Sequence, residues 1–152
     1  MKQNIPLSKI MTTDIITVNP RQTMNTVKEI FDAHNIHHIP VTSKRKVVGM
    51  ISKIDFFKIQ HGISLFKDKE IDAYNNAILR SLFVSEVMTN QIAKLSVDDT
   101  IEIAVSMFKE NYFHAIPIVD KEGNIAGIVT TFDLLNYAFN NEPTPKSITV
   151  IR

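Results

Sequence analysis

Apolar side chains recur at helical spacing in two stretches of the chain, each within a polar background. Positions three and four residues apart lie on one face of a helix, so the spacing predicts two amphipathic helices. Their apolar faces are Met24, Val27, Ile30 and Phe31 in the first helix and Ile101, Ala104, Met107 and Phe108 in the second. The two faces match position by position.

Short runs rich in Ile and Val surround these helices and predict β-strands. One run precedes each helix, at 15–18 and 92–95, and two runs around a polar turn follow it. The following runs are 39–41 and 47–51 in the first half, and 116–119 and 125–129 in the second. A further helix is expected after each pair, at about 52–60 and 130–139. Each half is therefore predicted as strand, helix, strand, strand, helix.

The chain is a tandem duplication. Residues 11–44 align without a gap with residues 88–121, and one inserted residue in the second polar turn then brings Gly49 over Gly127 and Asp55 over Asp133. We predict an α+β fold with a first repeat at 7–61, a helical connector at 62–83, a second repeat at 84–140 and a C-terminal tail at 141–152. The apolar face expected in the connector is Ile71, Tyr74, Ile78 and Leu82. The role of the tail stays open.

Composition excludes several classes of function. The 152 residues carry 17 Lys and Arg against 16 Asp and Glu, a net charge of +1 that argues against a nucleic-acid partner. The absence of Cys excludes disulfides and thiolate nucleophiles. No apolar run is long enough for a signal-peptide core or a membrane span, so we expect a cytoplasmic protein without a membrane partner. The five His residues lack a metal-binding spacing, and no nucleophile lies beside a base; we therefore expect neither a metal site nor catalytic residues.

The most informative segments are Gly-Met-Ile-Ser-Lys-Ile-Asp at 49–55 and Gly-Ile-Val-Thr-Thr-Phe-Asp at 127–133, at equivalent places in the two halves. A hydroxyl followed three residues later by a carboxylate is typical of a helix-capping box. The same arrangement also suits ligand binding, because a helix N-terminus binds phosphate through free N–H groups. A carboxylate one turn on offers two acceptor oxygens to a ribose diol. The two interpretations are compatible.

Together these features resemble the tandem CBS domain pair, also called a Bateman module. The resemblance rests on the openings at 10–12 and 87–89, the His-x-Ile-Pro blocks at 37–40 and 114–117, and the two segments that end in Asp55 and Asp133. It implies two repeats, each β-α-β-β-α, related by a pseudo-two-fold axis. It also implies an adenosine-containing regulatory ligand (AMP, ADP, ATP, NAD or S-adenosylmethionine) in the clefts between the repeats, with no cofactor required.

The resemblance implies two composite sites, each with a Ser/Thr–Asp pair from one repeat and an opening strand from the other. The Asp would bind ribose, the Ser or Thr phosphate, and apolar residues adenine. The primary site would comprise Thr12, Ile16, Ile36, His37, His114, Ile128, Thr130 and Asp133. The second would comprise Thr89, Ala93, Phe113, His38, Met50, Ser52 and Asp55.

We rank the Asp133 site first because its opening strand is apolar at Ile15 and Ile16, whereas the other site meets Ala93 and the charged Lys94. Lys53 and His38 could favour additional phosphates in the second site, or that site is empty.

The expected function is a non-enzymatic sensor whose change of shape reaches an effector protein that the sequence does not identify. A ligand-free association module with the same fold is the main alternative, and a small hydrolase or transferase is the least favoured. A homodimer is expected because the second helices carry more apolar side chains than one buried face uses. These residues are Phe56, Phe57 and Ile59 in the first repeat and Leu134, Leu135, Tyr137, Ala138 and Phe139 in the second. Of the latter, 134, 135 and 138 are expected on one face, with 137 and 139 pointing elsewhere.

Overall fold

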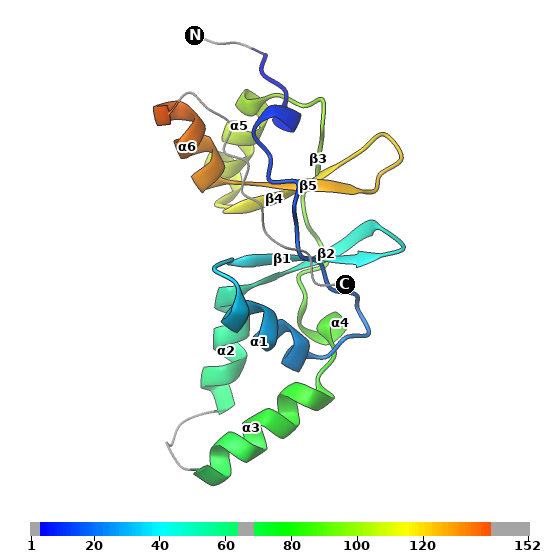
Figure 1. Cartoon of the computed structure of the whole chain (residues 1–152), viewed down its shortest axis with the longest axis vertical. Coiled ribbons are helices and arrows are strands. Elements are labelled where there is room, and N and C mark those ends of the chain that lie inside the picture. The colour runs from blue at the N-terminus through cyan, green and yellow to red at the C-terminus, as the bar shows by residue number, and fades with distance from the viewer. Residues whose placement is uncertain (1–3, 64–68, 141–152) are drawn as a thin grey trace. The chain divides into compact units, whose positions relative to one another are not determined.

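A computed structural model describes residues 4–63 and 69–140 (Figure 1). The first repeat holds the 3-10 turn η1 (Leu7–Lys9), α1 (Met24–Ala33), β1 (His38–Ser43), β2 (Lys46–Ser52) and α2 (Lys53–Ile63). Helix α3 (Lys69–Ser81) follows. The second repeat holds α4 (Val84–Val87), β3 (Leu95–Ser96), α5 (Ile101–Asn111), β4 (Ala115–Val119), β5 (Ile125–Thr130) and α6 (Thr131–Asn140). The α+β prediction is confirmed, while the tail at 141–152 lies outside the described residues.

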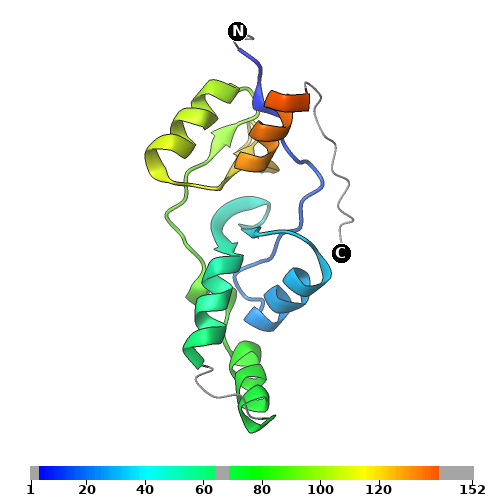
Figure 2. The ribbon, with the colours of Figure 1, turned by 90° about the vertical axis from the view of Figure 1, so that its left-hand side faces the viewer.

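The chain folds into two compact units, and each repeat contributes to both of them. The described part of unit 1 is residues 4–16, 45–47 and 92–140, and that of unit 2 is 17–44, 48–63 and 69–91. The segment that opens each repeat therefore packs with the body of the other repeat. In unit 2, α1 and α2 lie on the same side of the β1–β2 hairpin, and in unit 1, α5 and α6 lie on one side of the β3–β4–β5 sheet (Figures 1 and 2).

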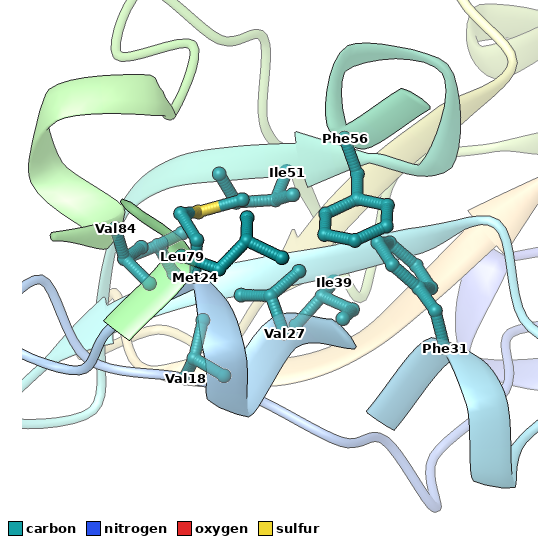
Figure 3. Close-up of a cluster of buried hydrophobic side chains, with 10 residues drawn as sticks. Val18, Met24, Val27, Phe31, Ile39, Ile51, Phe56, Leu79 and Val84 are labelled. Carbon is teal, nitrogen blue, oxygen red and sulfur yellow. The ribbon is translucent and has the colours of Figure 1, made fainter. Parts of the chain in front are cut away.

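The core of unit 2 forms where α1 and α2 pack against the hairpin (Figure 3). The predicted face of α1 is confirmed, since Met24, Val27 and Phe31 are buried. The Phe31 and Phe56 rings meet with their centroids 5.9 Å apart. The buried members are Val18, Met24, Val27, Phe31, Ile39, Val41, Ile51, Phe56, Leu79 and Val84.

The predicted apolar face of the connector is only partly correct. Leu82 packs against the core of unit 2 as predicted, but Tyr74 is 64% exposed. Leu79, which was not on that face, is 2% exposed and enters the core (Figure 3). Helix α3 packs against α1, and the N–H of Met24 donates to the carbonyl of Leu82 at 2.8 Å. This anchor turns the side of α3 that holds Leu79 toward the core. The side chain of Ile71 lies outside the described residues.

Unit 1 has an equivalent core under α5 and α6. The predicted face of α5 is confirmed, because Ala104 and Phe108 are buried and Ile101 and Met107 pack beside them. The buried members are Leu7, Ile10, Leu95, Ala104, Phe108, Ile116, Ile118 and Val129. Leu7 and Ile10 come from the opening segment of the first repeat, so this segment is part of the hydrophobic core of unit 1.

The strand predicted at 15–18 is wrong, because only Val18 pairs, in a single bridge to Val41. In the second repeat the corresponding strand is β3, which pairs parallel with β4. There the N–H of Val97 extends the ladder by donating to Val119 at 3.1 Å. Pro20 occupies the equivalent position in the first repeat and has no N–H to donate. Pairing therefore stops after Val18.

The predicted division of α6 into faces is also wrong. Leu134 and Tyr137 pack against the core of unit 1, and Asp133, the residue before Leu134, is buried. Leu135 is instead 56% exposed. The capping carboxylate fixes the rotation of the helix, since it must point back at the end of β5, and this places Leu135 and Ala138 outward.

Candidate functional site

A helix cap made of a hydroxyl and a carboxylate occurs at the same place in both repeats. The hydroxyl of Thr130 accepts the N–H of Asp133 at 3.2 Å and donates to its Oδ2 at 2.6 Å, and the N–H of Thr130 donates to the same Oδ2 at 2.8 Å. Ser52 accepts the N–H of Asp55 at 3.1 Å and donates to its Oδ2 at 2.5 Å. The capping interpretation is therefore confirmed in both repeats.

The caps leave one carboxylate oxygen available on Asp133. Its Oδ1 accepts no hydrogen bond from the described residues, although the residue is only 6% exposed. The side chain of Asp55 is more open, at 35% exposure, and its Oδ1 lies 3.5 Å from Nζ of Lys58. The two equivalent carboxylates thus lie in different environments: Asp133 is buried with an open acceptor oxygen, and Asp55 is more exposed and lies beside the ammonium group of Lys58.

The opening segment of each repeat crosses the strand of the other repeat at a glycine. Thr12 pairs with Ile128 in both directions, at 2.9 and 3.0 Å, and Thr89 pairs with Met50 in both directions at 2.9 Å. A Cβ on Gly127 would lie 2.7 Å from the carbonyl oxygen of Thr12. Glycine permits this close approach of two backbones.

Six of the eight residues predicted for the primary site lie in unit 1: Thr12, Ile16, His114, Ile128, Thr130 and Asp133. Thr12, Ile16 and Ile128 are buried, while His114 is exposed, with its carbonyl accepting the N–H of Thr131 at 3.3 Å. Ile36 and His37 belong to unit 2. Their participation in the site stays a prediction.

The second predicted site divides in the same way. Unit 2 holds Thr89, His38, Met50, Ser52 and Asp55, whereas Ala93 and Phe113 belong to unit 1. Met50 is 7% exposed and Thr89 is exposed, so the threonine of this set is accessible where Thr12 of the other set is buried.

Two expectations for phosphate binding stay predictions, and the structure shows contacts that bear on each. At the start of α2 two N–H groups are engaged, because the N–H of Lys53 donates to the carbonyl of His37 at 2.8 Å and that of Asp55 to the hydroxyl of Ser52 at 3.1 Å. The ammonium of Lys53, expected to favour phosphate, lies 5.9 Å from the ring centroid of Phe31 and 6.0 Å from that of Phe57. Such cation–π contacts hold the charge over the aromatic rings.

A pocket that the sequence did not predict lies beside Asp55. Its volume is about 420 Å³. The lining consists of Asp55, Lys58, Ile59, Leu82, Glu86, Val87 and Thr89. All of these residues belong to unit 2. Only Asp55 and Thr89 were identified from the sequence as site residues. The signal for Glu86 was its place directly before the opening motif at 87–89, three residues before Thr89.

Residues 4–63 and 69–140 contain no group of three or more His, Cys, Asp or Glu side chains arranged to hold a metal ion. Over the same ranges, every helix is too short or too polar to cross a bilayer.

Comparison with known sequences identifies both repeats. A family model described as "CBS domain" matches residues 7–62 and 84–140. The CBS domain-containing protein YhcV of Bacillus subtilis (strain 168) is 28% identical over 143 residues, which cover 93% of this chain and 91% of YhcV. Other relatives are longer: the chain spans 48% of MJ1225 of Methanocaldococcus jannaschii at 24% identity, and 22% of the inosine-5′-monophosphate dehydrogenase of Thermoplasma acidophilum at 23% identity.

Solved structures share the fold. CBSX2 of Arabidopsis thaliana, in complex with AMP, is 19% identical with a TM-score of 0.72, over 90% of this chain and 97% of that chain. The CBS domain pair of protein MJ0100, in complex with 5′-methylthioadenosine and S-adenosyl-L-methionine, is 21% identical with a TM-score of 0.71, over 91% and 98%. The two-repeat architecture predicted from the sequence is therefore confirmed.

Proposed function

The chain belongs to the CBS-domain family, and on that premise we propose that it is a non-enzymatic regulatory module that binds an adenosine-containing ligand and responds by changing shape. The observation that carries this proposal is the buried Asp133, whose Oδ1 is left open by the cap, in the same unit as the Thr12–Ile128 pairing. The AMP complex of CBSX2 and the S-adenosylmethionine complex of MJ0100 support the same ligand class.

In the proposed unit 1 site, Asp133 accepts hydrogen bonds from the ribose hydroxyls through its open oxygen. The buried Ile16 and Ile128 offer apolar contacts for adenine. A phosphate contact from Thr130 requires its hydroxyl to release the carboxylate, because that hydroxyl now donates to Asp133 at 2.6 Å. Ligand binding would thereby weaken the α6 cap, which gives the site a route to a change in shape.

The proposed module leaves its ligand intact. The hydroxyls nearest the proposed ribose positions, Ser52 and Thr130, each donate to a capping carboxylate, and the candidate His114 is exposed. Nucleophilic catalysis needs a base that is itself positioned by a third group. The match to the longer dehydrogenase covers 22% of that protein, which supports a regulatory segment in place of a catalytic one.

Thermal unfolding with a panel of AMP, ADP, ATP, NAD and S-adenosylmethionine tests the proposal. A ligand at a hundred times its dissociation constant is expected to stabilise the fold by about 2.7 kcal/mol, and the nucleotide recovered afterwards is expected to be unchanged. Guanosine nucleotides serve as the control for non-specific effects. If no adenosine compound raises the melting temperature, the chain is a ligand-free association module; release of phosphate from ATP would make it an enzyme.

We also propose that the working unit is a homodimer formed through α2 and α6. Large apolar side chains are exposed at equivalent places on the two helices: Ile54 and Phe57 on α2 match Phe132 and Leu135 on α6, with exposures of 63%, 42%, 53% and 56%. Phe139 continues the stripe on α6 at 81% exposure. A stable interface buries above about 1,000 Å², so the dimer has to cover an extensive apolar surface.

Sedimentation equilibrium at micromolar concentration is expected to give twice the mass of one chain, and Leu135→Glu is expected to give the single-chain mass. A charge placed in an apolar interface is desolvated without a partner. Lys121→Glu, at an exposed position in the β4–β5 turn, is the control and is expected to leave the dimer intact. A wild-type protein that sediments as a single chain, with and without AMP, would contradict the dimer.

A further inference from the structure

The pocket in unit 2 lies between α2 and the segment that follows α3. Its volume of about 420 Å³ falls in the range of pockets that bind small molecules, about 300–1,000 Å³. Ile59, Leu82 and Val87 form an apolar wall, and all three pack against the core of unit 2. Asp55 and Thr89 connect this pocket to the second predicted site.

Charged groups at the pocket have an acidic excess. Asp55 and Glu86 bring two carboxylates, and Lys58 brings one ammonium group, so the formal charge of the lining is −1. Glu86 uses Oε2 to accept the N–H of Phe83 at 2.8 Å, which leaves Oε1 without a hydrogen bond to the described residues. The Lys58–Asp55 pair is 3.5 Å long and its lysine side chain is 72% exposed, so solvent screens it.

The equivalent positions in unit 1 can be compared with the residues that line the pocket in unit 2. Backbone hydrogen bonds of the two opening segments correspond: the N–H of Ser8 donates to the carbonyl of Val97, and that of Ser85 to the carbonyl of Pro20, both at 3.1 Å. Each opening segment is thus held against the other repeat in the same way. Residues of the two segments can therefore be compared one by one.

This comparison reveals a reversal of charge. Lys9 stands in unit 1 where Glu86 stands in unit 2, each three residues before the paired threonine. Three residues after the capping carboxylate, Asn136 stands where unit 2 has Lys58. The positions equivalent to the pocket therefore sum to zero in unit 1, from Asp133 and Lys9, and to −1 in unit 2.

We propose that the unit 2 pocket binds the cationic, amino-acid-like end of an adenosine ligand, whereas unit 1 prefers an adenosine ligand that ends in phosphate. The assignment rests on the proposed function, because Asp55 must hold the ribose for the 5′ substituent to enter the pocket. Glu86 then accepts hydrogen bonds from the ligand's ammonium group through its open Oε1. Lys58 pairs with the ligand's carboxylate, and the apolar wall contacts the methylene carbons.

Electrostatics separates the two ligand classes. A phosphate monoester carries a charge of about −1.5 to −2 at neutral pH, and in this pocket it would meet two carboxylates and one exposed ammonium group. S-adenosylmethionine has a sulfonium and an ammonium group against one carboxylate, so the net charge of +1 on its tail is opposite to the formal charge of −1 on the lining. 5′-Methylthioadenosine carries none of these three charges, so its affinity measures the contribution of the adenosine part alone.

Calorimetry of the full chain tests the assignment, with Asp133→Asn as the background that weakens the unit 1 site. In this background S-adenosylmethionine is expected to bind about ten- to a hundredfold more tightly than AMP, as a charge-assisted hydrogen bond predicts. Adding Glu86→Gln keeps an acceptor for the Phe83 N–H. It is expected to reduce the affinity for S-adenosylmethionine to about that for 5′-methylthioadenosine, and to leave the affinity for 5′-methylthioadenosine unchanged. Lys9→Gln is the matched control and is expected to weaken AMP binding in otherwise wild-type protein.

Two results would overturn the assignment while preserving the proposed function: AMP binding to the Asp133→Asn protein as tightly as S-adenosylmethionine, or Glu86→Gln leaving the ratio between S-adenosylmethionine and 5′-methylthioadenosine unchanged. Failure of the wild-type chain to bind any of the three compounds would overturn the proposed function and this assignment together.

Discussion

AMP is expected to bind about ten- to a hundredfold more weakly to the Asp133→Asn protein than to the wild type. The open Oδ1 of Asp133 is the only oxygen of the cap that accepts no hydrogen bond from the described residues, and an amide group placed there donates instead of accepting. The residue is 6% exposed, so water cannot replace the lost acceptor at low cost. Isothermal titration calorimetry gives the two dissociation constants.

Stability must be measured alongside this affinity, because Asp133 also caps α6. Loss of a cap costs about 0.5–2 kcal/mol, so the melting temperature of the ligand-free variant is expected to fall by a few degrees. Thr130→Ala removes the hydroxyl of the same cap and leaves the carboxylate. Its affinity for adenosine, which has no phosphate for Thr130 to contact, separates the capping role from the binding role. Equal affinity for AMP in the Asp133→Asn and wild-type proteins would show that this carboxylate has only a capping role.

Gly127→Ala is expected to destabilise unit 1 by about 1–3 kcal/mol, the usual range for overpacking. The added Cβ would lie 2.7 Å from the carbonyl oxygen of Thr12 and 2.9 Å from Sδ of Met11. The carbonyl cannot move without breaking the paired hydrogen bonds between Thr12 and Ile128. Thermal unfolding followed by circular dichroism is expected to show a decrease of about 3–10 °C in the melting temperature.

Gly49→Ala is the matched variant in unit 2. Its Cβ would meet Sδ of Met88 at 2.6 Å, which a flexible side chain can relieve, and the carbonyl of Thr89 only at 3.0 Å. A smaller decrease in melting temperature is therefore expected for Gly49→Ala than for Gly127→Ala. The reverse order would mean that the crossing of Thr12 over Gly127 contributes little to the stability of unit 1.

Local chemistry explains what could be predicted from the sequence. A hydroxyl and a carboxylate three residues apart can reach each other within one helical turn, so the caps at Ser52 and Thr130 follow from spacing alone. The strands around the polar turns and the buried faces of α1 and α5 were also found, because their periodicity has one interpretation. The pairing of an opening segment with the other repeat was expected only from the family resemblance, and the crossing of Thr12 at Gly127 was not predicted, since no local pattern specifies a partner so far along the chain.

Tertiary packing decided the features that were predicted wrongly. Helix α6 is apolar on more than one side, so its periodicity did not distinguish Leu135 from Tyr137 as the inward residue; the buried cap at Asp133 did. In α3, Leu79 is buried because Leu82 is anchored to the start of α1. Glu86 was overlooked because its counterpart Lys9 differs in charge, and the repeat was detected from the residues that stay alike.

AMP binding in unit 1 through Asp133 is the basis of the proposed function. The ratio of the AMP dissociation constants of Asp133→Asn and Asp55→Asn, measured by calorimetry under the same conditions, tests it most directly, because the two variants change the same cap in the two repeats. A ratio of about ten or more is expected, with the affinity of Asp55→Asn close to that of the wild type. A ratio near one, or a greater loss of affinity in Asp55→Asn, would contradict it.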